Sequence, residues 1–67
     1  MAPIKRMAQR IQELRQCRGL TQEQLADKAG ISRGYLARLE TSRHDPSLST
    51  LEKLAKALGV KVGRLLE

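Results

Sequence analysis

The sequence has one cysteine, one aromatic residue and no long hydrophobic run. A single cysteine, Cys17, excludes an internal disulfide and a zinc cluster of several cysteines, and we expect it to pack as an inert helical side chain. A single aromatic residue, Tyr35, is too few for the stacking platforms that hold unpaired bases. No stretch of about eighteen apolar residues and no signal-peptide core is present, so we expect no membrane span and a cytoplasmic location.

Groups that carry out catalysis are also scarce. The chain has one histidine, His44, no clustered carboxylates and no glycine-rich phosphate loop, and its 67 residues leave little room for a substrate cavity. We therefore expect no enzyme, no metal, no cofactor and no small-molecule ligand. The length predicts a single domain, residues 1–67, whose small core would gain stability from a partner chain.

Positive charge, by contrast, is abundant. Thirteen Lys and Arg residues against seven Asp and Glu residues give a formal net charge of +6. An excess of this sign favours a polyanionic partner. Charge alone does not identify nucleic acid, because many small basic proteins simply carry a solvated surface.

Hydrophobic periodicity predicts helices throughout and no strand. The first helix is expected from about residue 4 to Arg18, because apolar residues recur there at intervals of three and four. Ser47 is the expected N-cap of a fourth helix that ends at Gly59, and a short helix follows. The expected inward stripes are Ile4, Met7, Ile11 and Leu14 in the first helix and Leu48, Leu51, Leu54, Ala55 and Leu58 in the fourth, and the apolar residues of the short last helix are Val62, Leu65 and Leu66.

The stretch from Thr21 to Glu40 predicts two short helices joined by a tight turn. Thr21 and Gln24 have the spacing of a capping box, and Gly30 fits a left-handed C-cap. Ser32 can cap the second helix, whose inward residues are Leu39 and either Tyr35 or Leu36. This pattern is typical of a helix-turn-helix.

These residues, in this order and spacing, resemble the Cro/C1-type (XRE) family of bacterial and phage repressors over nearly the whole chain. The resemblance implies an all-α, five-helix bundle of the lambda-repressor-like type. It also implies a transcriptional regulator, either a repressor or a restriction-modification controller, that binds double-stranded DNA at an inverted repeat as a homodimer. The matching features are Arg15, Gly19-Leu20-Thr21-Gln22, Gln24-Leu25-Ala26, Gly30-Ile31-Ser32, Leu36, Leu39-Glu40, Pro46-Ser47-Leu48, Leu51, Leu54-Ala55 and Ala57-Leu58-Gly59-Val60.

The second helix of such a motif enters the major groove, so the expected recognition helix spans about residues 32–40. Arg33 is the first candidate for base reading, because arginine matches the O6 and N7 acceptors of guanine. Arg38 can reach either a base or a phosphate. Gly34 would allow the helix to approach the groove closely. The candidate base readers are Ser32, Arg33, Gly34, Ala37 and Arg38.

Phosphate contacts are expected around this helix. In the family, a glutamine at the position of Gln22 binds a phosphate, and the loop after the recognition helix does the same. Tyr35 either packs against the first helix or donates its hydroxyl to DNA, and His44 is expected to be an exposed loop residue. The family often has Asn-Gly in place of Thr41-Ser42, which leaves the course of the loop open. The candidate phosphate ligands are Gln22, Tyr35, Thr41, Ser42 and Arg43.

Two structural roles follow from the same resemblance. Arg15 and Glu40 are expected to form an ion pair that ties the first helix to the end of the recognition helix. The last segment, residues 60–66, is the expected homodimer interface. The alternative is that its apolar residues close the core of one chain, and both hold if Val62 and Leu65 point inward. The candidate interface residues are Val60, Lys61, Val62, Arg64, Leu65 and Leu66.

Two other functions use similar small helical domains. An antitoxin or adaptor would use the fold mainly to hold another protein, and would need an exposed apolar patch that a homodimer leaves uncovered. RNA binding is disfavoured by the single aromatic residue.

Overall fold

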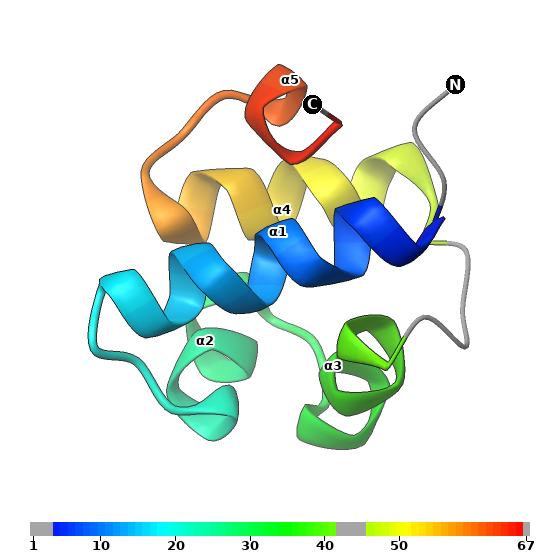
Figure 1. The fold of residues 1–67 in the computed structure, drawn as a ribbon. Helices are drawn as coiled ribbons and strands as arrows, with labels where there is room; N and C mark the ends of the chain where they lie inside the picture. The colour runs from blue at the N-terminus through cyan, green and yellow to red at the C-terminus, as the bar shows by residue number, and fades with distance from the viewer. Residues whose placement is uncertain (1–3, 42–45, 67) are drawn as a thin grey trace.

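The computed structural model describes residues 4–41 and 46–66, with side chains from residue 6 onward within those ranges. It confirms the all-α fold expected from the periodicity (Figure 1). Among the described residues, no helix combines the length and the apolar character needed to cross a membrane. The helices are α1 (Ile4–Cys17), α2 (Gln22–Ala29), α3 (Arg33–Glu40), α4 (Leu48–Leu58) and α5 (Val62–Leu65).

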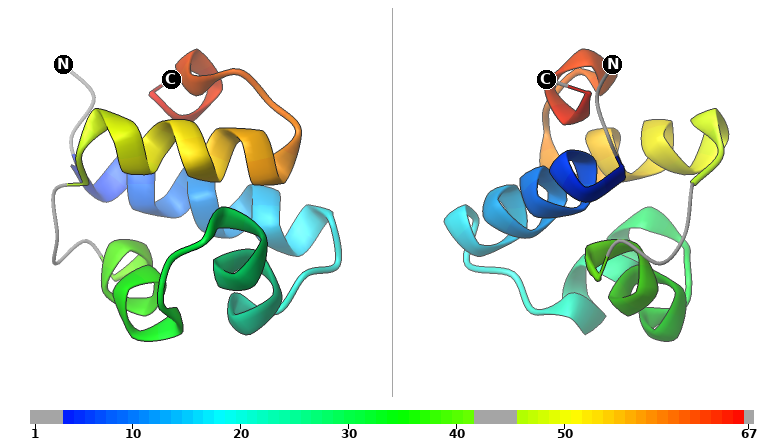
Figure 2. Two further views of the ribbon diagram at one scale, coloured as in Figure 1. Left: turned by 180° about the vertical axis from the view of Figure 1, so that it is seen from behind. Right: turned by 45° about the vertical axis from the view of Figure 1, so that its right-hand side comes forward.

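The helices form layers around α1 and α4, which lie side by side (Figures 1 and 2). Helices α2 and α3 pack beneath this pair, α2 against α4 and α3 against α1. Helix α5 packs on the opposite side, against both α4 and α1. The expected helix-turn-helix and the short last helix therefore lie at opposite ends of the molecule.

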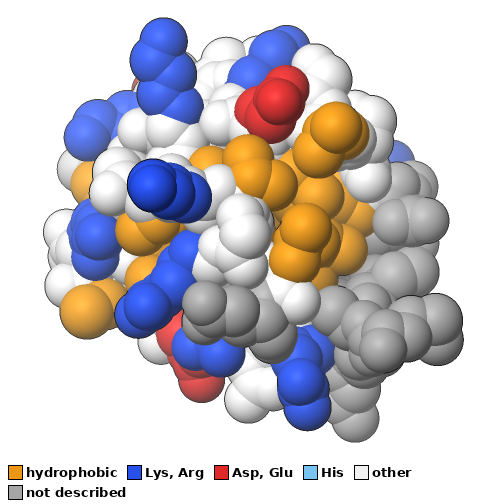
Figure 3. All heavy atoms as spheres, turned by 90° about the horizontal axis from the view of Figure 1, so that it is seen from above, with side chains coloured by type: hydrophobic (Ala, Val, Ile, Leu, Met, Phe, Trp, Pro, Cys, Tyr) orange, Lys and Arg blue, Asp and Glu red, His pale blue; other side chains and the backbone are white. Residues whose placement is uncertain are grey.

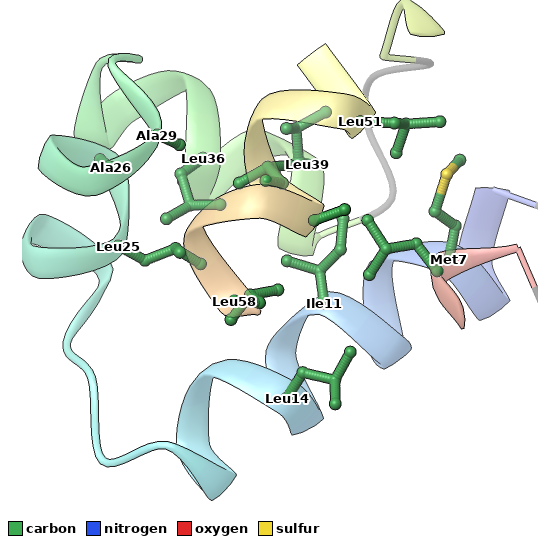
Figure 4. Packing of buried hydrophobic residues seen from close by; sticks show 13 residues of the cluster. Met7, Ile11, Leu14, Leu25, Ala26, Ala29, Leu36, Leu39, Leu51 and Leu58 are labelled. Carbon is green, nitrogen blue, oxygen red and sulfur yellow. The ribbon is translucent and has the colours of Figure 1, made fainter. Parts of the chain in front are cut away.

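A single hydrophobic core joins these helices. Leu25, Leu36 and Leu54 have no exposed surface, and side chains from α1, α2, α3 and α4 point into the same interior (Figure 4). Burying a leucine fully contributes about 1.5–3 kcal/mol, so this set is the main source of stability. The core cluster consists of Met7, Ile11, Leu14, Leu25, Ala26, Ala29, Leu36, Leu39, Leu51, Leu54, Ala55, Leu58 and Leu65.

The helix ends are formed by the residues that the sequence predicted. The Thr21 hydroxyl accepts a hydrogen bond from the Gln24 amide at 3.0 Å, and the Gln24 side chain accepts one from the Thr21 amide at 2.9 Å, which completes the capping box. Ser32 caps α3 by accepting from the Tyr35 amide at 3.0 Å. Ser47 caps α4 by accepting from the Thr50 amide at 3.2 Å.

Two packing predictions were wrong. Leu48 was expected in the core stripe of α4 but is 63% exposed, because it is the first residue of that helix and the first turn projects beyond α1 (Figure 2, right). Cys17 was expected to pack, but it is exposed, because it is the last residue of α1 and lies beyond the buried Leu14. The side chain of Ile4 lies outside the described residues.

Candidate nucleic-acid interface

The turn between α2 and α3 sets the direction of the expected recognition helix. Gly30 ends α2 with φ +71°, a conformation that costs other residues about 1–2 kcal/mol. The next amide, of Ile31, donates to the Ala26 carbonyl at 3.0 Å, and the half-buried Ile31 side chain packs on the core. Three residues, Gly30 to Ser32, therefore separate the two helices, and α3 begins at Arg33.

Helix α3 has one buried face and one exposed face. Leu36 and Leu39 are 0% and 2% exposed and anchor the helix in the core. Tyr35 is half-buried and packs on the core cluster, which supports the packing interpretation without testing its proposed contact to DNA. Of the candidate base readers, Ser32, Arg33, Gly34 and Arg38 are exposed and Ala37 is half-buried.

Arg15 and Glu40 form a well-buried ion pair between α1 and the end of α3. The Arg15 Nε lies 2.8 Å from Glu40 Oε2, and its Nη2 donates to Oε1 at 3.1 Å. The side chains are 12% and 3% exposed. The third guanidinium nitrogen, Nη1, donates to the Leu20 carbonyl at 2.9 Å, so the pair also holds the loop between α1 and α2.

Gln22 takes part in the same network, which sequence reasoning did not predict. Its Nε2 donates to Glu40 Oε1 at 3.1 Å, so the first residue of α2 is tied to the last residue of α3. A side-chain amide carries two N–H donors, so one remains for a phosphate when the other is bound to a carboxylate. The phosphate contact of Gln22 therefore stays a prediction that is compatible with this bond.

One hollow brings together two of the candidate ligands, one from α2 and one from α3. It has a volume of about 410 Å³ and lies between the start of α2 and the start of α3. Arg33, a candidate base reader, shares this hollow with Gln22, a candidate phosphate ligand. Its lining consists of Arg15, Thr21, Gln22, Glu23 and Arg33.

The loop after α3 is described at its two ends, at Thr41 and again from Pro46. Thr41 is exposed, and its hydroxyl donates to the Arg38 carbonyl at 2.9 Å, closing the end of the helix. Ser42, Arg43 and His44 lie outside the described residues, so their expected roles remain predictions.

The expected dimer segment divides into buried and exposed residues. Leu65 is 0% exposed and belongs to the core of the single chain, so its assignment to a partner surface is corrected. Leu66 is 43% exposed, and Figure 3, drawn from the α5 side, shows hydrophobic side chains gathered on this face. Val60 and Val62 are half-buried against the core, and Lys61 and Arg64 are exposed.

Arg18 is a structural residue that the sequence pattern did not reveal. Its Nε donates to the Leu58 carbonyl at 2.6 Å and so binds the end of α4. The two residues are 40 positions apart, and no local signal connects them.

Comparison with known proteins identifies relatives along most of the chain. The sequence pattern of the helix-turn-helix family HTH_3 matches residues 11–65. The immunity repressor protein of Bacillus phage phi105 is 53% identical over 60 residues. This match covers 90% of the chain but 42% of the repressor, so the chain spans less than half the length of that relative.

Solved structures share the fold closely. The restriction-modification controller protein C.AhdI from Aeromonas hydrophila superposes with a TM-score of 0.91 at 37% identity, covering 92% of this chain and 94% of that one. SinR, a regulator known from Bacillus subtilis, superposes with a TM-score of 0.88 at 37% identity in its complex with DNA. That match covers 91% of this chain and 98% of the SinR chain.

Proposed function

The chain belongs to the HTH_3 (Cro/C1-type, XRE) helix-turn-helix family, whose members are transcriptional regulators rather than enzymes, and from this membership we propose what it binds. Residues 1–67 act as one domain that recognises an inverted-repeat operator in double-stranded DNA as a homodimer. Helix α3 enters the major groove. The observation that carries this proposal is the division of α3 into a face anchored by Leu36 and Leu39 and a face that exposes Arg33 and Arg38.

Arg33 is the main reader of sequence in this proposal. It is the first residue of α3, and the N-terminal residues of a recognition helix contact base edges. A bidentate bond to guanine contributes about 1–3 kcal/mol of discrimination against another base. Neighbouring bases or phosphates are contacted along the same face of α3 by Ser32, Ala37 and Arg38.

Phosphate contacts orient the domain over the groove. Gln22 contributes the amide N–H that is not bound to Glu40, at the N-terminus of α2 where backbone dipoles also favour an anion. The other proposed contacts to the DNA backbone come from Tyr35, Thr41, Ser42 and Arg43. These contacts position the protein but carry no sequence information themselves.

A homodimer is proposed because one copy reads too little DNA. Helix α3 has eight residues and is therefore about 12 Å long, which fits one exposure of the major groove. The described part of the chain measures 29 × 22 × 20 Å, so two copies side by side can place their α3 helices one helical turn of about 34–36 Å apart. The proposed contact between copies is formed by Val60, Lys61, Val62, Arg64 and Leu66.

The comparisons support a regulator of this kind. The phi105 relative is named an immunity repressor, C.AhdI is a restriction-modification controller, and the SinR structure contains DNA. Each of these matches extends over at least 90% of the present chain, including α2 and α3.

Selection of bound duplexes from a random DNA pool, at two salt concentrations, tests the proposal. The wild-type chain is expected to recover an inverted repeat, and Arg33→Ala to weaken the preference at one position in each half-site. Arg6→Ala is the matched control, because Arg6 is an exposed arginine on α1. Recovery of no motif, with binding that only fades as salt rises, would show non-specific charge attraction and contradict the proposal.

A further inference from the structure

Much of the positive charge lies away from the proposed recognition helix. Helix α3 carries two cations, Arg33 and Arg38, whereas α4 carries Lys53 and Lys56 and the end of α2 carries Lys28. All five side chains are exposed. A cluster of cations outside α3 needs an explanation other than base reading.

Three of these cations surround one open hollow, here called the lysine hollow. It has a volume of about 490 Å³ and lies between the end of α2 and the face of α4 that packs on it. The other three lining residues are small, and the lining, as far as the structure describes the chain, contains no carboxylate. The lining consists of Lys28, Ala29, Gly30, Lys53, Lys56 and Ala57.

The position of the lysine hollow relates it to the proposed DNA-binding motif. Gly30, which is part of its lining, is also the residue at which α2 ends before α3. Figure 2 (left) shows this turn passing just below α4. The hollow therefore lies beside the helix-turn-helix, at the junction of α2 with α4.

We propose that the lysine hollow binds the phosphate backbone of the duplex beyond the operator half-site that α3 contacts. This inference rests on the proposed function and extends its footprint onto flanking DNA. The ion pairs among the described residues are Arg10–Glu13 and Arg15–Glu40, so the charges of Lys28, Lys53 and Lys56 are not neutralised within the protein. Each lysine is a flexible point charge that can meet phosphate oxygens from several directions.

The composition of the hollow favours DNA over an acidic protein partner. Protein interfaces depend on a few large side chains, mostly aromatic residues and arginine, buried at the centre of the contact. The lining of the lysine hollow contains no aromatic residue and no arginine, and the exposed large hydrophobic residues of the described chain, Leu48 and Leu66, lie outside it. A polyanion needs only the three exposed charges, and the small residues between them leave room for its backbone to approach.

The test compares two duplexes that contain the same operator. One ends at the operator edges and the other has flanking DNA on both sides, and the affinity for each is measured over a range of salt concentrations. The wild-type chain is expected to bind the longer duplex more tightly, with a steeper dependence of log K on log salt. Each phosphate that a lysine neutralises adds about 0.9 to this slope, so the expected increase is up to about 3 per protomer.

The variant Lys28→Gln/Lys53→Gln/Lys56→Gln is expected to lose both the affinity gain and the extra slope on the longer duplex. The ratio of the two affinities cancels the general effect of removing three charges. Lys28→Arg/Lys53→Arg/Lys56→Arg is the matched control, because it keeps the charge and should keep the gain. Circular dichroism is the check that both variants remain folded.

An unchanged ratio in the glutamine variant, or a wild-type chain that binds both duplexes equally, would overturn the inference. Capture of polyglutamate through the three lysines without any effect of flanking DNA would also overturn it, in favour of an acidic protein partner. If the wild-type chain fails to bind the operator in the short duplex, that result would instead contradict the proposed function. The failure of the inference and the failure of the proposed function are therefore distinguishable.

Discussion

At the scale of single residues, the two glycines of the helix-turn-helix have different backbone conformations. Gly30 lies in the left-handed region with φ +71°, whereas Gly34 lies inside α3 with helical geometry. At both positions a methyl group would meet no atom of the protein within 4 Å. Strain therefore explains Gly30, but nothing within the free protein explains a glycine at position 34.

The substitution Gly34→Ala is expected to stabilise the protein while weakening its binding to DNA. Alanine in a helix interior is about 0.5–1 kcal/mol more stable than glycine, and the new methyl group would stand between α3 and the groove. Urea unfolding and operator titration measure the two effects. Gly30→Ala is the comparison and should destabilise by about 1–2 kcal/mol because of its positive φ. Unchanged DNA binding in Gly34→Ala would remove close approach as the reason for this glycine.

The Arg15–Glu40 pair makes a second prediction for single residues. Glu40→Ala is expected to lower the free energy of unfolding by about 3–5 kcal/mol, because it leaves the Arg15 guanidinium, 12% exposed, without its carboxylate. Gln22 loses its acceptor in the same variant. Urea denaturation measures the effect, and Glu13→Ala is the control. The Arg10–Glu13 pair is separated by 3.7 Å and the Glu13 side chain is 57% exposed, so losing this pair should cost less than about 1 kcal/mol. Equal effects of the two variants would show that burial of the Arg15–Glu40 pair has no energetic consequence.

At the scale of helices, local hydrogen bonds at the N-termini define where α2, α3 and α4 begin. Thr21, Ser32 and Ser47 each have an extended backbone and a hydroxyl that accepts from an amide three residues later. Each bond satisfies one of the amides that a helix start leaves without a partner.

Replacing a cap by alanine is expected to destabilise the protein by about 1 kcal/mol. Thr21→Ala and Ser47→Ala should show this loss in thermal or urea unfolding, and Ser49→Ala, at an exposed position within α4, is the control with a change of less than about 0.5 kcal/mol. Ser32→Ala should lose the same stability and, if its hydroxyl also donates to a base, additional affinity for the operator. Equal stability of the cap and control variants would contradict the role of these bonds.

At the scale of the whole molecule, the arrangement of layers separates the proposed recognition helix from the proposed contact between copies. Helices α2 and α3 lie on one side of the α1–α4 pair and α5 lies on the other (Figure 1). A contact between copies near α5 therefore leaves the exposed face of α3 accessible. The adjacent residues Leu65 and Leu66 have opposite environments, 0% and 43% exposed, which makes this segment suitable for a matched test.

We expect Leu66→Glu to shift the protein toward monomer and to weaken operator binding, with little change in the stability of each copy. A buried charge at a dimer contact is costly, whereas Leu66 contributes little to the core of one chain. Sedimentation velocity and concentration-dependent DNA binding measure the effect. Leu65→Ala should instead destabilise the fold by about 2–5 kcal/mol. Leu48→Glu, at another exposed leucine outside the proposed interface, is the control; a larger loss of association in that variant would move the interface to the start of α4.

Much of the fold was predictable because its signals are local. The capping box of Thr21 and Gln24, the left-handed turn at Gly30 and the inward positions of α2 and α3 involve residues within a few positions of one another. Which of Tyr35 and Leu36 fills the core was open in the sequence, and the structure places Leu36 at 0% exposure. The Arg15–Glu40 pair was implied by resemblance and not by pattern.

The sequence by itself determined the helices, their ends, the helix-turn-helix and the positive charge, because these depend on residues that are neighbours along the chain. Only the tertiary structure decided which side chains from different helices meet. It joined Gln22 to Glu40 and Arg18 to the Leu58 carbonyl, and it placed the three lysines around one hollow. It also buried Leu65 while exposing Leu48 and Leu66. Periodicity cannot show such differences, since it identifies the face of a helix that is apolar but not how far the neighbouring helices extend over it.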